Sequence, residues 1–306
     1  MSKTVAVLMG GWSSERPVSL SSGNECANAL ERAGYTVERI DLKRDMEALL
    51  NALDPQPDVV FNALHGPYGE DGCVQGMLNM LGIPYTHSGL LASAMAMDKP
   101  VAIRLFESVG IKCPEHVVVT KQQVLDGEIM APPYVIKPIN EGSSFGVEIV
   151  EEDTGGPPFD ADTWPYGNTV MVERFIPGRE LTVSVMDDRA LAVTEIRPRE
   201  GFYDYEAKYT DGKADHLVPA PIPADVEAEA MRLSVVAHDV LGCRGVSRAD
   251  FRYDEREDGV EGLYMLEVNT QPGMTPLSLV PEQAVHVGIS FEDLVSWMVE
   301  RAACDS

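Results

Sequence analysis

The sequence predicts an α/β domain at the N-terminus and an α+β region after it. Two observations support this prediction. Apolar strand-like runs alternate with helical patterns over the first ~95 residues, which is typical of a doubly wound domain with a parallel sheet. Farther along the chain, strand-like runs follow one another without matching helices between them, and this order favours antiparallel pairing.

The N-terminal domain is expected to bind a ligand at one edge of its sheet. The expected strands are residues 4–9, 37–42 and 58–64, and the expected helices are residues 19–33, 45–53 and 73–81. The first strand is an apolar run that ends at Gly10-Gly11, and the third leads into a polar segment. Ligands of such sheets bind at the carboxyl ends of the strands. We therefore expect residues 10–15 and 65–72 to line a binding site.

A long helix from residue 90 to about 109 is expected to lead into the second region. The strands expected there are residues 133–138, 146–150, 169–175, 180–186 and 190–197, and the later helices are residues 225–242 and 291–303. Residues 199–217 form a polar loop that carries several tyrosines and lysines. Long loops without regular structure are usually functional, so we expect a lid that closes over a bound ligand.

Composition restricts the kinds of partner. The chain has 306 residues, 44% hydrophobic, which is enough for two or three domains with ample cores. Its formal net charge of −25 argues against nucleic acid or an anionic membrane as a partner. The five cysteines form no CxxC pair, the N-terminus has no signal-peptide pattern, and no run reaches membrane-spanning length. We therefore expect a cytoplasmic protein with reduced thiols.

The most informative chemical pattern is a polar face on an expected hairpin. Asp258-Gly259, a tight-turn dipeptide, separates Arg248-Ala249-Asp250 from Leu266-Glu267-Val268-Asn269. With the strand period of two, the arginine, both carboxylates and the amide share one face, while the apolar residues point away. Carboxylate and amide oxygens suit Mg²⁺ that is shared with nucleotide phosphates. The alternative is a solvated sheet face, but the amide-rich loop at 270–275 favours an anion site.

Three other segments fit a nucleotide and its substrate less specifically. Residues 137–146 begin with Lys137 and continue as a Gly/Ser-rich loop that can approach phosphates, although an ordinary turn is the alternative. Residues 173–180 form a connector with carboxylates at both ends, which either contacts a nucleoside or is an acidic linker. Residues 273–279 lead into a helix start, where free amides bind a carboxylate or simply form an N-cap.

Taken in chain order, these segments resemble the ATP-grasp superfamily, and more specifically the D-alanine–D-alanine ligase family. The matching motifs are GGWSSER (10–16), LHG (64–66), EDG (70–72), MDK (97–99), EGSS (141–144), FYDYEAKY (202–209) and EVNT (267–270). The resemblance extends from about residue 5 to 299. Two features depart from it: Gln271 replaces a commonly small residue, and residues 151–168 are short and rich in Gly, Pro and Asp.

The resemblance implies an N-terminal substrate-binding domain followed by a two-part ATP-grasp fold. The implied divisions are residues 1–96, a central subdomain at 97–182, and a C-terminal metal-binding subdomain at 183–306 that carries the lid at 199–217. The implied reaction is ATP-dependent ligation of two D-alanine molecules through D-alanyl phosphate, which supplies peptidoglycan precursors. The implied cofactors are ATP and two Mg²⁺ or Mn²⁺, and the implied assembly is a homodimer.

The resemblance also implies roles for individual residues. Catalytic roles fall on Glu15, Ser143, Tyr209, Arg248 and Gly273; substrate binding falls on Glu15, His65, Lys208, Ser278 and Leu279. ATP binding falls on Lys99, Lys137, Glu173 and Glu180, and metal binding on Asp250, Glu267 and Asn269. The alternatives are a D-alanine–D-lactate ligase, another ATP-grasp carboxylate–amine ligase, or a non-enzymatic nucleotide-binding regulator. A regulator would be expected to lack Arg248 or a metal ligand, and this chain keeps all of them.

Overall fold

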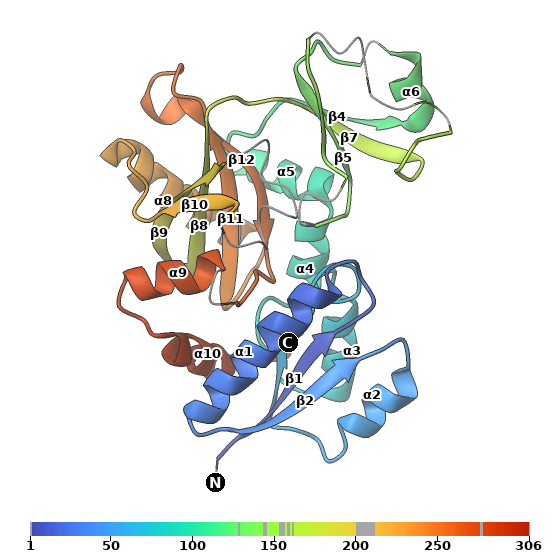
Figure 1. Ribbon diagram of the computed structural model, residues 1–306, viewed down its shortest axis with the longest axis vertical. Helices are drawn as coiled ribbons and strands as arrows, with labels where there is room; N and C mark the ends of the chain where they lie inside the picture. The colour runs from blue at the N-terminus through green and yellow to red at the C-terminus, as the bar shows by residue number, and fades with distance from the viewer. Residues whose placement is uncertain are drawn as a thin grey trace.

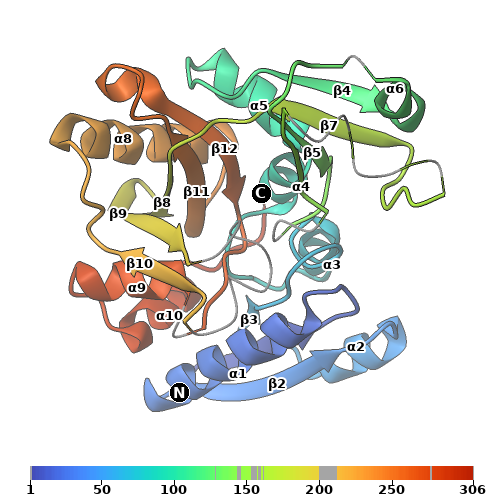
Figure 2. The same cartoon turned by 45° about the horizontal axis from the view of Figure 1, so that its top comes forward.

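The computed structural model describes residues 2–127, 129–142, 146–152, 157, 160, 162–199, 212–275 and 278–305. It has an N-terminal α/β part, a small central antiparallel sheet and a larger C-terminal antiparallel sheet (Figures 1 and 2). The predicted fold class is therefore confirmed. Within the described residues, no helix combines the length and the apolar character needed to cross a bilayer.

The N-terminal part is a parallel sheet of order β2-β1-β3. Its elements are β1 (Thr4–Gly10), α1 (Arg16–Arg32), β2 (Thr36–Leu42), α2 (Met46–Ala52), β3 (Val59–Asn62) and α3 (Cys73–Leu81). β1 is buried along most of its length because it lies in the middle of the sheet. One core cluster joins β1, β3 and α1 to the C-terminal helix α10 (Phe291–Glu300), so the end of the chain packs against its beginning (Figure 1).

The segment predicted as one long helix is two helices, α4 (Leu90–Met97) and α5 (Lys99–Ser108). Asp98 between them has an extended backbone, and its side chain accepts a hydrogen bond from the Val101 amide at 3.0 Å. The break follows from Pro100, which has no N–H for a helical hydrogen bond and whose ring crowds the preceding turn. The prediction of a continuous helix was wrong, and the break places Lys99 at the start of α5.

The antiparallel strands form two separate sheets rather than a single one. The central sheet has the order β4-β7-β5-β6 and contains β4 (His116–Thr120), β5 (Tyr134–Pro138), β6 (Glu148–Val150) and β7 (Thr169–Arg174), with α6 (Lys121–Asp126) beside it. The sequence did not predict β4 or α6. Among the described strands, β4 lies at the edge of the sheet next to β7, and its residues are mostly exposed, although Val117–Val119 form a short apolar run.

The C-terminal sheet has the order β10-β9-β8-β11-β12. Its strands are β8 (Arg179–Met186), β9 (Arg189–Pro198), β10 (Ala214–Leu217), β11 (Val246–Tyr253) and β12 (Leu263–Asn269), with helices α8 (Ala224–Val240) and α9 (Leu279–His286). A core cluster joins α8 to one face of this sheet, where Ala249 and Phe251 are buried. The prediction of a loop over 199–217 was wrong for its last residues, because Ala214–Leu217 form β10 and pair with β9.

The predicted hairpin exists, but its turn and its register differ from the prediction. Asp258-Gly259 is not a two-residue turn: a longer connection contains the short 3₁₀ helix η1 (Gly259–Gly262). A bulge in the pairing after Asp250 aligns Phe251 with Met265, so Leu266 is the extra residue. Leu266 consequently lines a pocket beside Glu267 instead of pointing away, whereas Val268 is buried as expected.

Candidate active site

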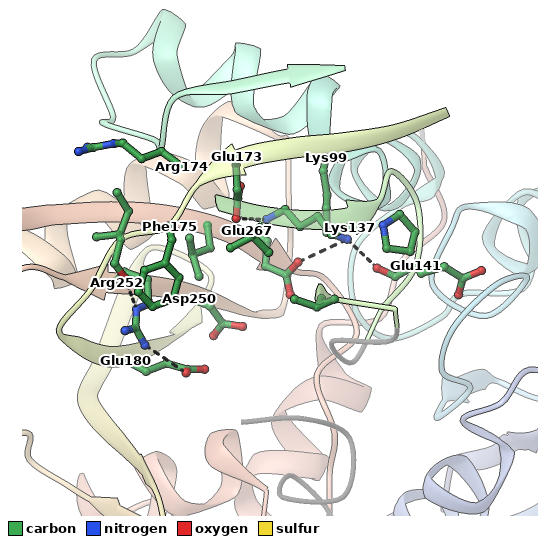
Figure 3. Close-up of a pocket in the computed structure, with 15 residues that line it drawn as sticks. Lys99, Lys137, Glu141, Glu173, Arg174, Phe175, Glu180, Asp250, Arg252 and Glu267 are labelled. Atoms are coloured by element: carbon green, nitrogen blue, oxygen red, sulfur yellow. Dashed lines mark hydrogen bonds and ion pairs between the residues drawn. The ribbon is translucent and has the colours of Figure 1, made fainter. Parts of the chain in front are cut away.

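Two adjoining pockets contain most of the residues singled out from the sequence. The first, called here the inter-sheet pocket, lies between the central and C-terminal sheets (Figure 3). The second, called here the N-terminal pocket, is lined by residues of the N-terminal part together with α5, β11 and β12. Lys99, Glu141 and Glu267 line both pockets. These three residues therefore lie between a molecule bound in one pocket and a molecule bound in the other.

Two buried lysines contribute positive charge to the inter-sheet pocket. Lys137 on β5 pairs with Glu173 on β7, with 2.6 Å between Nζ and Oε1, and both side chains are less than a tenth exposed. Lys99 donates a hydrogen bond to the Glu141 carbonyl at 2.6 Å and lies 3.6 Å from Oε2 of Glu267. Burial lowers the pKa of Lys99, while the Glu267 carboxylate opposes that shift. The two ammonium groups are suited to holding the phosphates of a nucleotide.

The other end of the inter-sheet pocket is partly apolar and carries one more carboxylate. It is lined by Phe175, Ile176, Glu180 and Arg252. Arg252 stands beside Phe175 and Glu180 in Figure 3. The sequence analysis assigned no role to Arg252, because its contacts are with residues more than seventy positions earlier in the chain.

The three expected metal ligands lie along β11 and β12. Asp250 is directly opposite Glu267, and Asn269 is opposite Arg248. Arg248 donates two hydrogen bonds to Asp250, at 2.8 and 2.6 Å, and the Thr182 hydroxyl donates a third at 2.6 Å. Asp250 lines the inter-sheet pocket, Asn269 lines the N-terminal pocket, and Glu267 lines both.

This donor set fits a hard divalent cation. Among the described residues, no three His, Cys, Asp or Glu side chains come together as a metal site, so the Asn269 amide oxygen is needed as the third ligand. Its Oδ1 accepts a hydrogen bond from the Gln271 amide at 2.7 Å, which fixes the orientation of the side chain. Two carboxylates and an amide oxygen are ligands that suit Mg²⁺ when phosphates complete the coordination.

Two buried carboxyl groups lie together in the N-terminal pocket. Glu15 is 5% exposed and Glu70 is 7% exposed. A Cβ added at Gly142 would lie 2.9 Å from Oε1 of Glu70 and 3.4 Å from Oε2 of Glu15, so the two groups face one glycine. Burial, followed by the Glu15 charge, raises the pKa of Glu70 well above its usual value. The raised pKa favours the neutral form of Glu70, so Glu15 is the member of the pair suited to bind an ammonium group. The sequence analysis placed Glu70 in the expected binding segment 65–72 but gave it no individual role.

His65 lines the same pocket and is 6% exposed. Its Nε2 lies 3.4 Å from the Ser22 hydroxyl. Burial lowers the pKa of His65 to about 4, and the nearby Arg248 charge contributes to the shift. His65 is therefore a neutral, polar side chain of this pocket at neutral pH.

The remaining predicted residues are near the site or outside the described part of the chain. Gly273 lines the N-terminal pocket, and a Cβ placed on it would lie 3.0 Å from the Ser278 hydroxyl. Ser278 precedes α9, which begins at Leu279, so the predicted helix start is confirmed; neither residue lines the two pockets. Ser143, Lys208 and Tyr209, with most of the predicted lid, lie outside the described residues.

Lowering the pH should destabilise the protein through its buried histidines. Burial lowers the pKa of His65 to about 4 and that of His87 to about 3, both below the usual value of 6.5. Between pH 6.5 and 4 the unfolded chain therefore binds more protons, and this contribution to the free energy of unfolding decreases as the pH falls.

Urea unfolding of His87→Asn and the wild type at pH 7 and pH 5 measures this contribution. We expect the variant to lose less stability than the wild type over this range, because asparagine does not take up a proton between these pH values. Asparagine is chosen because it tolerates the left-handed backbone at position 87. His286→Asn, at an exposed position, is the control. Equal losses in the wild type and His87→Asn would contradict the prediction. The raised pKa of Glu70 has the opposite effect on stability as the pH falls. Glu70 is present in both proteins, so this effect cancels in the comparison.

Comparisons with known proteins show which family the chain resembles. A family model described as D-ala D-ala ligase C-terminus matches residues 105–300, and one described as D-ala D-ala ligase N-terminus matches residues 46–88. The chain is 60% identical to a D-alanine–D-alanine ligase of Rhodospirillum rubrum and 58% identical to one of Paramagnetospirillum magneticum, with full coverage of both chains in each case.

Solved structures show the same fold. An ATP-complexed D-alanine–D-alanine ligase from Bacillus anthracis superimposes with a TM-score of 0.80 at 32% identity, covering 98% of this chain and 97% of that one. The VanG D-Ala:D-Ser ligase from Enterococcus faecalis gives 0.79 at 28% identity, covering 98% and 99%. The two antiparallel sheets around a shared pocket define an ATP-grasp ligase. Within that class, the chain belongs to the D-alanine–D-alanine ligase family.

Proposed function

We propose that this protein joins two D-alanine molecules in an ATP-dependent reaction that passes through D-alanyl phosphate and releases ADP and phosphate. The proposal rests on one observation: the two pockets are both lined by Lys99, Glu141 and Glu267. A γ-phosphate in the inter-sheet pocket would then lie beside a carboxylate in the N-terminal pocket, as phosphoryl transfer requires. The names of the relatives support D-alanine as the substrate. The product is a building block for peptidoglycan precursors.

Bringing two anions together needs compensating positive charge. Two unit anions about 4 Å apart repel by about 4 kcal/mol at an effective dielectric constant of 20. Asp250, Glu267 and Asn269 would hold two Mg²⁺ or Mn²⁺, which would neutralise this repulsion when bound. Lys99 and Lys137 would bind the phosphates, while Glu173 and Glu180 would contact adenine and ribose.

The N-terminal pocket would bind the first D-alanine. Glu15 would receive its ammonium group, and neutral His65 would contact the same substrate without adding positive charge. Arg248 and the Gly273 amide would stabilise the oxyanion that forms when the second D-alanine attacks. This assignment agrees with the position of Arg248 in the N-terminal pocket.

The second D-alanine and the lid involve residues that are assigned by family resemblance. Lys208, Ser278 and the Leu279 amide would bind the carboxylate of the second D-alanine. Ser143 and Tyr209 would hydrogen-bond with Glu15 when the lid closes. A closed lid protects the acyl phosphate, because water would otherwise hydrolyse it.

A coupled assay of ADP release tests the proposed activity. We expect rapid release with D-alanine alone and formation of D-alanyl-D-alanine. Adding D-lactate or D-serine should yield little mixed product near neutral pH, because the high-identity relatives are named for D-alanine alone. Preferential formation of D-alanyl-D-lactate would support the depsipeptide ligase instead. ATP binding without turnover for any amino acid would support a regulator.

We further propose that the protein acts in the cytoplasm, where ATP is available, as a homodimer. Four large apolar side chains at the end of α3 and the start of α4 are exposed: Met80 by 90%, Leu81 by 38%, Leu90 by 40% and Leu91 by 65%. Exposed apolar side chains on two helices in contact are typical of an interface, and a two-fold axis would pair this surface with itself.

Sedimentation at micromolar concentration tests the assembly. We expect a dimer for the wild type and a monomer for Leu91→Glu, because each copy would place a carboxylate in the apolar contact. The matched control is Val285→Glu on α9, where the valine is 62% exposed but lies on another part of the chain. A wild-type monomer, or a Leu91→Glu dimer of unchanged stability, would refute this assignment of the interface.

A further inference from the structure

Arg252 lies at the end of a charged row that follows the length of the active site. Arg248, Asp250 and Arg252 alternate along β11 and share one face of the strand. Their partners on β8 are Ser184, Thr182 and Glu180, respectively. Arg248 lines the N-terminal pocket, whereas Asp250 and Arg252 line the inter-sheet pocket. Arg252 is therefore at the end of the row that is farthest from the N-terminal pocket, where the carboxylate of the first D-alanine would bind.

The guanidinium of Arg252 contacts several residues of the connector at 173–180. Nε donates to the Ile176 carbonyl at 3.0 Å, and Nη2 donates to the Gly178 carbonyl at 2.8 Å. Nη1 lies 3.6 Å from Oε2 of Glu180, and the group stands 5.8 Å from the centre of the Phe175 ring. The side chains of Arg252 and Glu180 are 17% and 16% exposed, so this network is largely shielded from water (Figure 3).

The connector held by Arg252 is tightly packed against β11. Gly178 has a φ of +96°, and a Cβ at this position would lie 2.1 Å from the Tyr253 carbonyl oxygen. The connector therefore cannot move closer to β11, and the hydrogen bonds from Arg252 to the Ile176 and Gly178 carbonyls keep it from moving away from that strand. Its orientation depends on the fork geometry of arginine, which a lysine ammonium does not reproduce.

We propose that Arg252 is a positioning residue for nucleotide specificity: it holds the Glu180 carboxylate and the Ile176–Gly178 carbonyls in place for recognition of the ribose. This inference rests on the proposed ATP-binding function. Without the guanidinium, two carbonyls and a partly buried carboxylate lose a charged partner, and Glu180 can turn toward solvent. The reacting phosphate is at the other end of the pocket, beside Lys99. Ground-state binding of the nucleotide should therefore suffer more than the chemical step.

Equilibrium binding of ATP, 2′-deoxyATP and 3′-deoxyATP to the whole protein tests this role without requiring turnover. We expect the wild type to prefer ATP over at least one deoxy analogue by about tenfold, the effect of a single well-held polar contact. Arg252→Met should weaken ATP binding about tenfold and remove most of that preference. Arg252→Lys should fall between the two, because it retains the charge but not the fork.

Two further variants separate positioning from a general loss of structure. Glu180→Gln should remove the same preference, and combining it with Arg252→Met should add little, because both act through one contact. Arg174→Met is the matched control: Arg174 lines the same pocket but donates to the Tyr264 hydroxyl instead of the connector. The preference should survive in this control.

The inference is overturned if Arg252→Met, or Arg252→Lys when the methionine variant does not fold, keeps the wild-type preference. Additive effects of Arg252→Met and Glu180→Gln would overturn it as well. A wild type that does not distinguish ATP from either deoxy analogue also contradicts it. Failure of the ligase reaction with normal nucleotide discrimination would instead contradict the proposed function and leave the role of Arg252 supported.

Discussion

Glu267→Gln should lose nearly all turnover while keeping its fold. Glu267 lies opposite Asp250 on the hairpin, and its Oε2 is 3.6 Å from the Lys99 ammonium. Glutamine keeps the shape but removes the charge, which should weaken Mg²⁺ binding and leave the repulsion between γ-phosphate and substrate less compensated. If that repulsion of about 4 kcal/mol returns in full, the rate falls by roughly a thousandfold.

The expected loss is measured as ADP release over a range of Mg²⁺ concentrations, with Mn²⁺ binding in the presence of ATP as a second measurement. Both the rate and the Mn²⁺ affinity should fall. Glu261→Gln is the control, because this glutamate is exposed in η1 of the same hairpin connection. Near-normal turnover of Glu267→Gln at low Mg²⁺ would exclude Glu267 from the metal site.

Arg248→Lys should lower kcat by about a hundredfold to a thousandfold, the usual effect of removing an oxyanion-stabilising donor. Arg248 is 13% exposed and donates to both oxygens of Asp250. Lysine keeps one positive charge but cannot hold Asp250 with two parallel hydrogen bonds while also reaching the reacting oxygen. ATP binding should change much less than kcat, because Arg248 lines the N-terminal pocket and not the inter-sheet pocket.

The chain offers a closely matched control for this variant. Arg256 donates two hydrogen bonds to Asp254, at 2.9 and 2.8 Å, in the same two-residue spacing, but its side chain is 74% exposed. Arg256→Lys should leave kcat and both substrate KM values unchanged. If Arg248→Lys had a similarly small effect on kcat, the pairing with Asp250 would be structural and the oxyanion role would be wrong.

Local sequence was sufficient for the fold class and for much of the chemistry. The apolar run in β1 and the helical patterns that follow it specify buried parallel strands and covering helices, because these patterns reflect periods of the backbone itself. The period of two likewise places Arg248 and Asp250 on one face of β11, with Ala249 and Phe251 in the core on the other.

Pairing between distant segments decided the rest. The bulge after Asp250 turns Leu266 into the pocket, since the register of β12 depends on its partner strand. Glu70 meets Glu15 beside Gly142, and Arg252 meets Glu180, only after separate elements have packed together. Backbone periods act over a few residues, whereas burial and charge at these positions are set by neighbours far away in the chain. The sequence by itself therefore determined which faces carry the reactive groups, and the tertiary structure decided which of those groups meet.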